Sequence, residues 1–116
     1  MNEFATLYDY LIQKRGATET FPFGEDVLVM KVMGKMFALI RINEIPTKIN
    51  LKCHPERALA LRAQYDAIQP GYHMSKQHWN TITVGDIPMS LVFELIDHSY
   101  DLVVASLKKA ERMSLA

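Results

Sequence analysis

Hydrophobic and polar residues alternate in several segments of the central part of the chain, and this alternation predicts an antiparallel sheet. Segments 27–33 and 36–42 are rich in apolar and β-branched residues and are separated by Gly34-Lys35. Two such runs joined by two residues, with glycine first, predict a hairpin with a type II′ turn. Residues 48–53 predict a third strand. Its polar and its apolar side chains fall on opposite faces, Lys48, Asn50 and Lys52 on one and Ile49, Leu51 and Cys53 on the other.

A further strand is predicted over 79–84, after a short extended piece at 72–74 and a turn. One face of this strand carries Trp79, Thr81 and Thr83. If that face coincides with the polar face of the third strand, one side of the sheet is basic and polar, with an aromatic ring at its edge. Such a surface suits phosphate groups and stacked bases.

Helical periodicity predicts the remaining elements. An N-terminal helix is expected to end at Gly16, and a second helix to run from Pro55 to the residues before Pro70. From Pro88 onward the apolar residues keep one helical phase, which fits either one long helix or two nearly collinear helices broken near 97–99. The apolar positions of the three helices are, in order, Phe4, Leu7, Tyr8, Leu11 and Ile12; Ala58, Leu61, Tyr65 and Ile68; and Leu91, Val92, Leu95, Ile96, Val103, Val104 and Leu107.

The element order is therefore helix, three strands, helix, one or two strands, helix. Residues 17–26 are expected to form a loop that Phe21 and Phe23 pack onto the body. This order predicts an α+β fold, with a mostly antiparallel sheet of four to six strands and helices packed on one face. A chain of 116 residues with 49% apolar and 22% charged residues is long enough for one domain, spanning 1–116.

Composition also limits the setting in which we expect the protein to work. The single cysteine cannot form an internal disulfide and suits a reducing compartment. Residues 1–10 do not resemble a signal peptide, and no apolar run is long enough to span a membrane. We therefore expect a cytoplasmic protein without a membrane partner, and the sequence favours a monomer.

The distribution of charge is more informative than its total. The formal net charge is zero, which argues against a generic polyanion binder. Residues 27–84 nevertheless hold eight basic and three acidic residues, whereas the flanks hold five basic and ten acidic ones. Lysines on solvent-facing strands also protect sheet edges against aggregation, so the excess is compatible with an ordinary solvated face as well.

Other candidate chemistries have weaker support in the residue spacing. Cys53-His54, His73 and His78 lack the paired spacings of zinc ligands, so we expect no metal site. Cys53 is expected to be a buried small hydrophobic residue rather than a nucleophile. No acid–base pair and no glycine-rich phosphate loop is evident, so we expect neither catalytic residues nor a cofactor. Trp79 is either a core anchor or an exposed stacking residue.

Several blocks of the sequence together resemble the MmcQ/YjbR-like family. They span nearly the whole chain in the same order: Phe21-Pro22-Phe23-Gly24, residues 31–38, residues 50–53 with Pro55-Glu56, residues 70–74 with Lys76 and 78–81, and residues 99–103. The resemblance implies a compact α+β fold related in shape to type III secretion chaperones and frataxin-like domains, and a "double wing" DNA-binding module. The candidate surface that it carries over consists of Lys52, His73, Lys76, His78, Trp79 and Asn80.

Two functional hypotheses follow from these observations. The first is a non-enzymatic DNA-binding protein, in which the Trp79 ring adds to phosphate-backbone contacts made by four basic residues. These are Lys48, Lys52, Arg62 and Lys76. The second is an adaptor that binds a protein or a small ligand and has no role with nucleic acid, with Trp79 and His73 lining its pocket.

Overall fold

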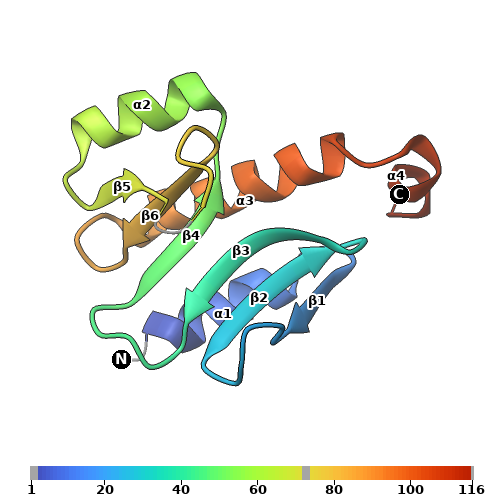
Figure 1. The fold of residues 1–116 in the computed structure, drawn as a ribbon, viewed down its shortest axis with the longest axis horizontal. Coiled ribbons are helices and arrows are strands. Elements are labelled where there is room, and N and C mark those ends of the chain that lie inside the picture. The colour runs from blue at the N-terminus through green and yellow to red at the C-terminus, as the bar shows by residue number, and fades with distance from the viewer. Residues whose placement is uncertain (1–2, 72–73, 116) are drawn as a thin grey trace.

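The structure, a computed structural model, describes residues 3–71 and 74–115 (Figure 1). Within these ranges the chain forms four helices and six strands. In chain order they are α1 (Glu3–Ile12), β1 (Ala17–Thr20), β2 (Val27–Val32), β3 (Lys35–Arg41), β4 (Lys48–Lys52), α2 (Pro55–Gln64), β5 (Ile68–Pro70), β6 (Trp79–Thr83), α3 (Met89–Ala105) and α4 (Lys109–Leu115).

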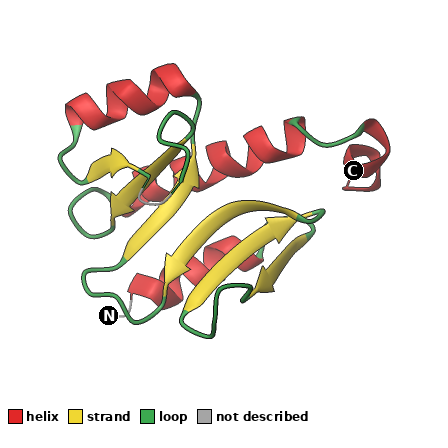
Figure 2. Cartoon of the chain, viewed as in Figure 1, coloured by secondary structure: helices red, strands yellow, loops and turns green. Residues whose placement is uncertain are grey.

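The strands form one antiparallel sheet in the order β1-β2-β3-β4-β6-β5. Helices α1 and α3 contact each other and lie behind the sheet in Figure 1, and α2 lies next to β5. Figure 2 shows that the helices leave the opposite face of the sheet uncovered. This arrangement confirms the predicted α+β class. The helix-facing side chains of the sheet form the main core and include Leu28, Met30, Ile40, Ile49, Leu51, Ile68 and Ile82.

The sheet consists of two three-stranded halves that meet at a short ladder. Strands β3 and β4 pair only from Ala38↔Leu51 to Ile40↔Ile49. Beyond that point the buried Ser99 hydroxyl of α3 donates to the Phe37 carbonyl (2.6 Å) and accepts from the Lys52 N–H (2.9 Å). The hydroxyl therefore occupies the place of the next ladder hydrogen bond and satisfies backbone groups that would otherwise be buried without partners.

The β2–β3 hairpin turns one residue earlier than predicted. Met33 and Gly34 both have positive φ, 50° and 82°, so the turn is of type I′ and not type II′. The register shifts at Met30/Lys31, which leaves Phe37 as an extra residue in β3. Because of this bulge, Phe37 and Ala38 are both buried, and the Phe37 ring meets Tyr100 of α3 edge to face.

Two strands were absent from the prediction. Residues 17–20 form edge strand β1 instead of a loop, and Ile68 belongs to β5 because α2 ends at Gln64. The extended piece predicted at 72–74 includes residues that lie outside the described ranges. The predicted packing of Phe21 and Phe23 onto the body is wrong, since these side chains are 46% and 69% exposed.

Helix α3 runs without a break through residues 97–99, and the chain leaves the helical path only at 106–108. The polar side chains at 97–99 form hydrogen bonds to neighbouring elements and do not cap a helix. Ser99 joins two strands, and Asp97 accepts hydrogen bonds from Tyr10 (2.7 Å) and Lys14 of the α1 region.

Candidate functional site

The register of β4 and β6 decides which side chains share the uncovered face of the sheet. Lys48 pairs with Thr83, Asn50 with Thr81, and Lys52 with Trp79. Paired residues of an antiparallel ladder project to the same side. The two polar faces predicted from the sequence therefore coincide. We call this side the open face, and its residues on β2 to β6 are Val27, Val29, Lys31, Met36, Leu39, Arg41, Lys48, Asn50, Lys52, Gln69, Trp79, Thr81 and Thr83.

Four basic residues project from strands onto the open face without a carboxylate partner. Besides Lys48 and Lys52 they are Lys31 and Arg41, which follow from the β2–β3 register. In the described part of the chain the ion pairs are Lys14–Asp97 and Arg57–Glu94, so neither involves these four. Their charges remain available to an anionic ligand.

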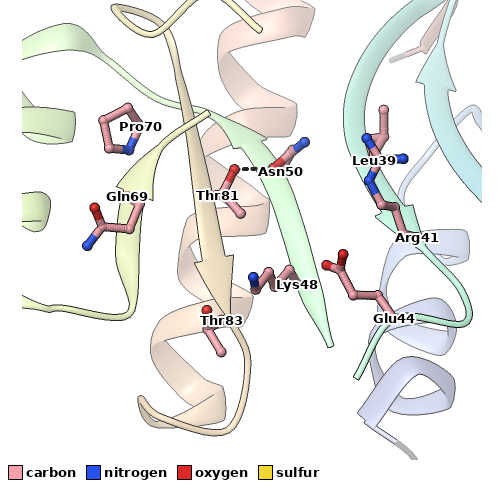
Figure 3. Close-up of a pocket in the computed structure, with 9 residues that line it drawn as sticks. All are labelled: Leu39, Arg41, Glu44, Lys48, Asn50, Gln69, Pro70, Thr81 and Thr83. Atoms are coloured by element: carbon pink, nitrogen blue, oxygen red, sulfur yellow. Dashed lines mark hydrogen bonds between the residues drawn. The ribbon is translucent and has the colours of Figure 1, made fainter. Parts of the chain in front are cut away.

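The open face contains a hollow with a polar and an apolar end. The polar end has a volume of about 360 Å³ (Figure 3). Its side chains come from β3 to β6 and from the turn after β3. They are Leu39, Arg41, Glu44, Lys48, Asn50, Gln69, Pro70, Thr81 and Thr83.

The apolar end also has a volume of about 360 Å³ and lies between the loop before β2 and the loop before β6. Leu39, Arg41 and Asn50 line both ends, so the two ends adjoin. The floor of this end is a small apolar cluster, separate from the main core, to which Val27, Leu39 and Met36 belong. Among the described residues, the lining consists of Phe23, Val27, Met36, Leu39, Arg41, Asn50, Met74, Ser75 and Trp79.

Asn50 is the uncharged polar side chain at the junction of the two ends. It is 8% exposed, and its Oδ1 accepts a hydrogen bond from the Thr81 hydroxyl at 2.5 Å. Its amide nitrogen points away from Thr81 in Figure 3 and has no hydrogen-bond partner among residues 3–71 and 74–115. Among the described residues no buried side-chain nitrogen or oxygen lacks a partner, so this amide nitrogen is accessible to solvent from the hollow and can donate to a ligand group.

Arg62 and Asn80 lie elsewhere, on the helix side of the sheet. Asn80 pairs with Leu51 and is 2% exposed, and its Oδ1 accepts from Arg62 Nε at 2.7 Å. The same guanidinium donates to the carbonyls of Lys76 and Trp79. Arg62 thus holds the turn before β6 in place, and the structure does not bring this pair together with the open-face residues.

The remaining predicted residues belong to the loop before β6. Lys76 and His78 are exposed, and the His78 carbonyl accepts from the Cys53 N–H at 2.8 Å. His73 lies outside the described residues. The loop also supplies Met74 and Ser75 to the apolar end of the hollow.

The sequence also raised the questions of the reactivity of Cys53 and the binding of a metal ion. Cys53 is buried, and burial raises the pKa of its thiol, so the reactive thiolate is disfavoured. Over the described ranges, no three histidine, cysteine or acidic side chains gather in a way that would hold a metal ion. None of the helices in those ranges combines the length and the apolar character needed to cross a bilayer.

Sequence reasoning missed several residues that line the hollow. Strand alternation would have placed Arg41 beside Leu39, and it had already placed Asn50 and Thr81 on the correct face. Phe23 reaches the hollow from an irregular loop, and no periodic signal predicts such a position. Alternation also separates Asn80 from Trp79, so the pattern itself could have excluded Asn80 from this face.

One family model and several relatives match most of this chain. The YjbR family model matches residues 12–102. YbdF of Escherichia coli O157:H7 is 39% identical over 94 residues, which are 79% of this chain and 76% of YbdF. YjbR of Escherichia coli K12 is 32% identical over 110 residues, which are 94% of this chain and 93% of YjbR. Both relatives are described as uncharacterized proteins.

Solved structures show the same fold. A Deinococcus radiodurans protein, known from a crystal structure, superposes with a TM-score of 0.91 at 39% identity, covering 99% of this chain and 88% of that one. A Pseudomonas syringae protein superposes with a TM-score of 0.74 at 28% identity, covering 88% of this chain and 98% of that one. Family model, relatives and fold agree, and the chain therefore belongs to the YjbR family.

Proposed function

We propose that the protein binds nucleic acid, DNA in the first instance, without catalysing a reaction on it, and that the open face of the sheet is the contact surface. The observation that carries this proposal is the presence of four strand cations without carboxylate partners on one face, next to Trp79. Basic side chains that neutralise phosphates release bound counterions, and this release drives binding. An aromatic ring next to them adds a stacking surface for bases.

Salt dependence tests the phosphate contacts. Replacing Lys48 or Lys52 by alanine is expected to weaken binding and to reduce the slope of log K against log salt by about 0.7–0.9 per lost contact, lower for single strands than for duplex DNA. Fluorescence anisotropy of labelled single-stranded and duplex DNA across a salt series measures the slope. Lys109→Ala is the matched control, because it removes the same charge from the exposed surface of α4.

Two results would contradict the proposal. One is the absence of binding to either form of DNA at low salt. The other is an equal reduction of the salt slope of DNA binding by Lys109→Ala and by Lys48→Ala. This result would mean that DNA binding depends only on the total charge of the protein.

A second candidate function is supported by the apolar end of the hollow. Phe23 is 69% exposed at its rim, and large exposed rings beside an apolar floor are common where proteins or small ligands bind. In this case the protein is an adaptor without a role in nucleic-acid binding. Binding of a purified peptide or small ligand that is lost in Phe23→Ala and unchanged in Lys52→Ala would favour this alternative.

A further inference from the structure

We propose that the hollow is a nucleotide site for single-stranded nucleic acid, in which the apolar end receives one unpaired base and the polar end the adjoining phosphate. This inference rests on the proposed function and specifies it further. A duplex keeps both faces of its bases covered by neighbouring bases, so only an unpaired base can enter such a site without first being unstacked.

The apolar end has the surfaces that a flat aromatic ligand requires. Phe23 and Trp79 come from opposite borders of this end, and both line it. Its floor of Val27, Met36 and Leu39 is apolar and offers no competing hydrogen bonds. Its volume of about 360 Å³ falls in the range of about 300–1,000 Å³ that is typical of small-ligand pockets.

Asn50 supplies a polar contact that an aliphatic ligand could not use. Its side chain is more than nine-tenths buried at the point where the two ends meet, and its amide nitrogen lacks a partner among the described residues. A base edge presents ring nitrogen and carbonyl acceptors to such a donor. The Asn50 orientation is fixed by the hydrogen bond from Thr81, so the donor is already in place before a ligand binds.

The polar end provides for the phosphate. Arg41 and Lys48 line it, and Glu44 is the acidic side chain among its described lining residues. Two cations against one carboxylate leave a net positive site, and neither cation is engaged in an ion pair within the described ranges. The apolar end would receive the base, the Asn50 amide would contact the edge of the base, and Arg41 and Lys48 at the polar end would contact the phosphate. This sequence of contacts matches the order of groups in one nucleotide.

The test uses the full chain and its only tryptophan as a reporter. A single-stranded DNA oligonucleotide, the same strand with abasic sites in place of its bases, and the matched duplex are titrated against the protein at one salt concentration. We expect the normal single strand to bind about five- to a hundredfold more tightly than the abasic strand, and to quench the fluorescence of Trp79. Duplex binding is expected to leave this fluorescence nearly unchanged.

Two phenylalanines of one loop give a matched pair of variants. Phe23→Ala is expected to reduce binding of the normal strand about five- to a hundredfold and to leave binding of the abasic strand unchanged. Phe21→Ala removes the same ring from a side chain that is also exposed but does not line the hollow, and it should change neither. Both positions are exposed, so both variants are expected to fold.

The outcomes separate this inference from the proposed function. If the normal strand, the abasic strand and the duplex bind equally, the protein binds nucleic acid through phosphates and the nucleotide site is wrong. If none of the three binds, the proposed function itself is wrong. Equal losses in Phe21→Ala and Phe23→Ala, or tight binding of an uncharged apolar peptide at the hollow, would also overturn the nucleotide site.

Discussion

Ser99 is the residue that joins the two halves of the sheet. It is fully buried, and its hydroxyl satisfies one backbone acceptor on β3 and one backbone donor on β4. Removal of the hydroxyl leaves both backbone groups buried in an apolar environment, and each such group costs free energy.

Ser99→Ala is therefore expected to lower the free energy of unfolding by about 1–3 kcal/mol. Urea denaturation followed by circular dichroism measures the change. Ser114→Ala, which removes an exposed hydroxyl on α4, is the control and should stay within about 0.5 kcal/mol of the parent protein. Equal stability of the Ser99→Ala variant and the parent would mean that the hydroxyl does not hold the two strands together.

Arg62 illustrates how a basic residue can be confused with a binding residue. Its guanidinium makes three hydrogen bonds, to the Asn80 side chain and to the carbonyls of Lys76 and Trp79. The planar fork of arginine can make such a set, whereas the ammonium group of lysine cannot reproduce its geometry.

Arg62→Lys is accordingly expected to lower the free energy of unfolding by about 1–3 kcal/mol although the charge is kept. The salt slope of DNA binding should stay unchanged, because we place Arg62 in the scaffold and not at a phosphate. Parallel measurement of urea denaturation and of the salt slope checks both points. Equal stability of the Arg62→Lys variant and the parent would mean that the three hydrogen bonds of Arg62 do not hold the turn before β6 in place.

At the level of elements, the junction of β4, α2 and α3 depends on a neutral histidine. The Nε2 atom of His98 on α3 accepts a hydrogen bond from the His54 N–H at 3.2 Å, and the His54 side chain in turn caps the N-terminus of α2. Burial lowers the pKa of His98 below its ordinary value, and the neighbouring Arg57 and His54 lower it further, partly offset by Asp101 and Glu94.

This lowered pKa predicts a pH dependence of stability. The unfolded chain binds a proton at His98 at higher pH than the folded chain does, so stability is retained above about pH 6.5 and is lost as pH falls through the folded-state value. Urea midpoints between neutral and mildly acidic pH measure the effect. His98→Gln keeps an acceptor but does not titrate, and it should flatten the profile, whereas the exposed His78→Gln should not.

Helices α1 and α3 are held together by a mixed aromatic and polar contact. The Tyr10 ring stacks on Phe93 with 4.2 Å between centroids, and the Tyr10 hydroxyl donates to Asp97. That hydrogen bond raises the pKa of Tyr10 to about 12. Lys14 pairs with the same carboxylate and lies over the Tyr10 ring, so Asp97 joins the two helices and does not interrupt α3.

Helices and strands whose apolar residues recur with a clear period were predictable from the sequence, and those without such a period were not. Strict alternation predicted β4, β6 and the polar face of each strand, and the β4–β6 register shows that these two faces coincide. β1 reads Ala-Thr-Glu-Thr and has no apolar alternation, so pairing with β2 alone defines it. Tyr65 and Ile68 extend the helical stripe of α2, and periodicity could not reveal that the chain becomes extended at Tyr65.

At the scale of the whole molecule, neutral total charge conceals a separation of charge. Five of the eight basic residues of segment 27–84 lie on strands, while most acidic residues belong to the flanking segments, which contribute α1, β1, α3 and α4. The sequence could predict this excess and its face, but it could not predict the hollow. The hollow depends on two loops that approach from distant parts of the chain, and no local pattern fixes their positions.

The hollow also lies across the short β3–β4 ladder, since Leu39 and Arg41 come from one half of the sheet and Lys48 and Asn50 from the other. A ligand bound there would contact both halves of the sheet and bridge the short β3–β4 ladder. By mass action, occupancy would then resist any parting of the two halves. Ligand binding and the contact between the two halves of the sheet would then depend on the same strands, β3 and β4.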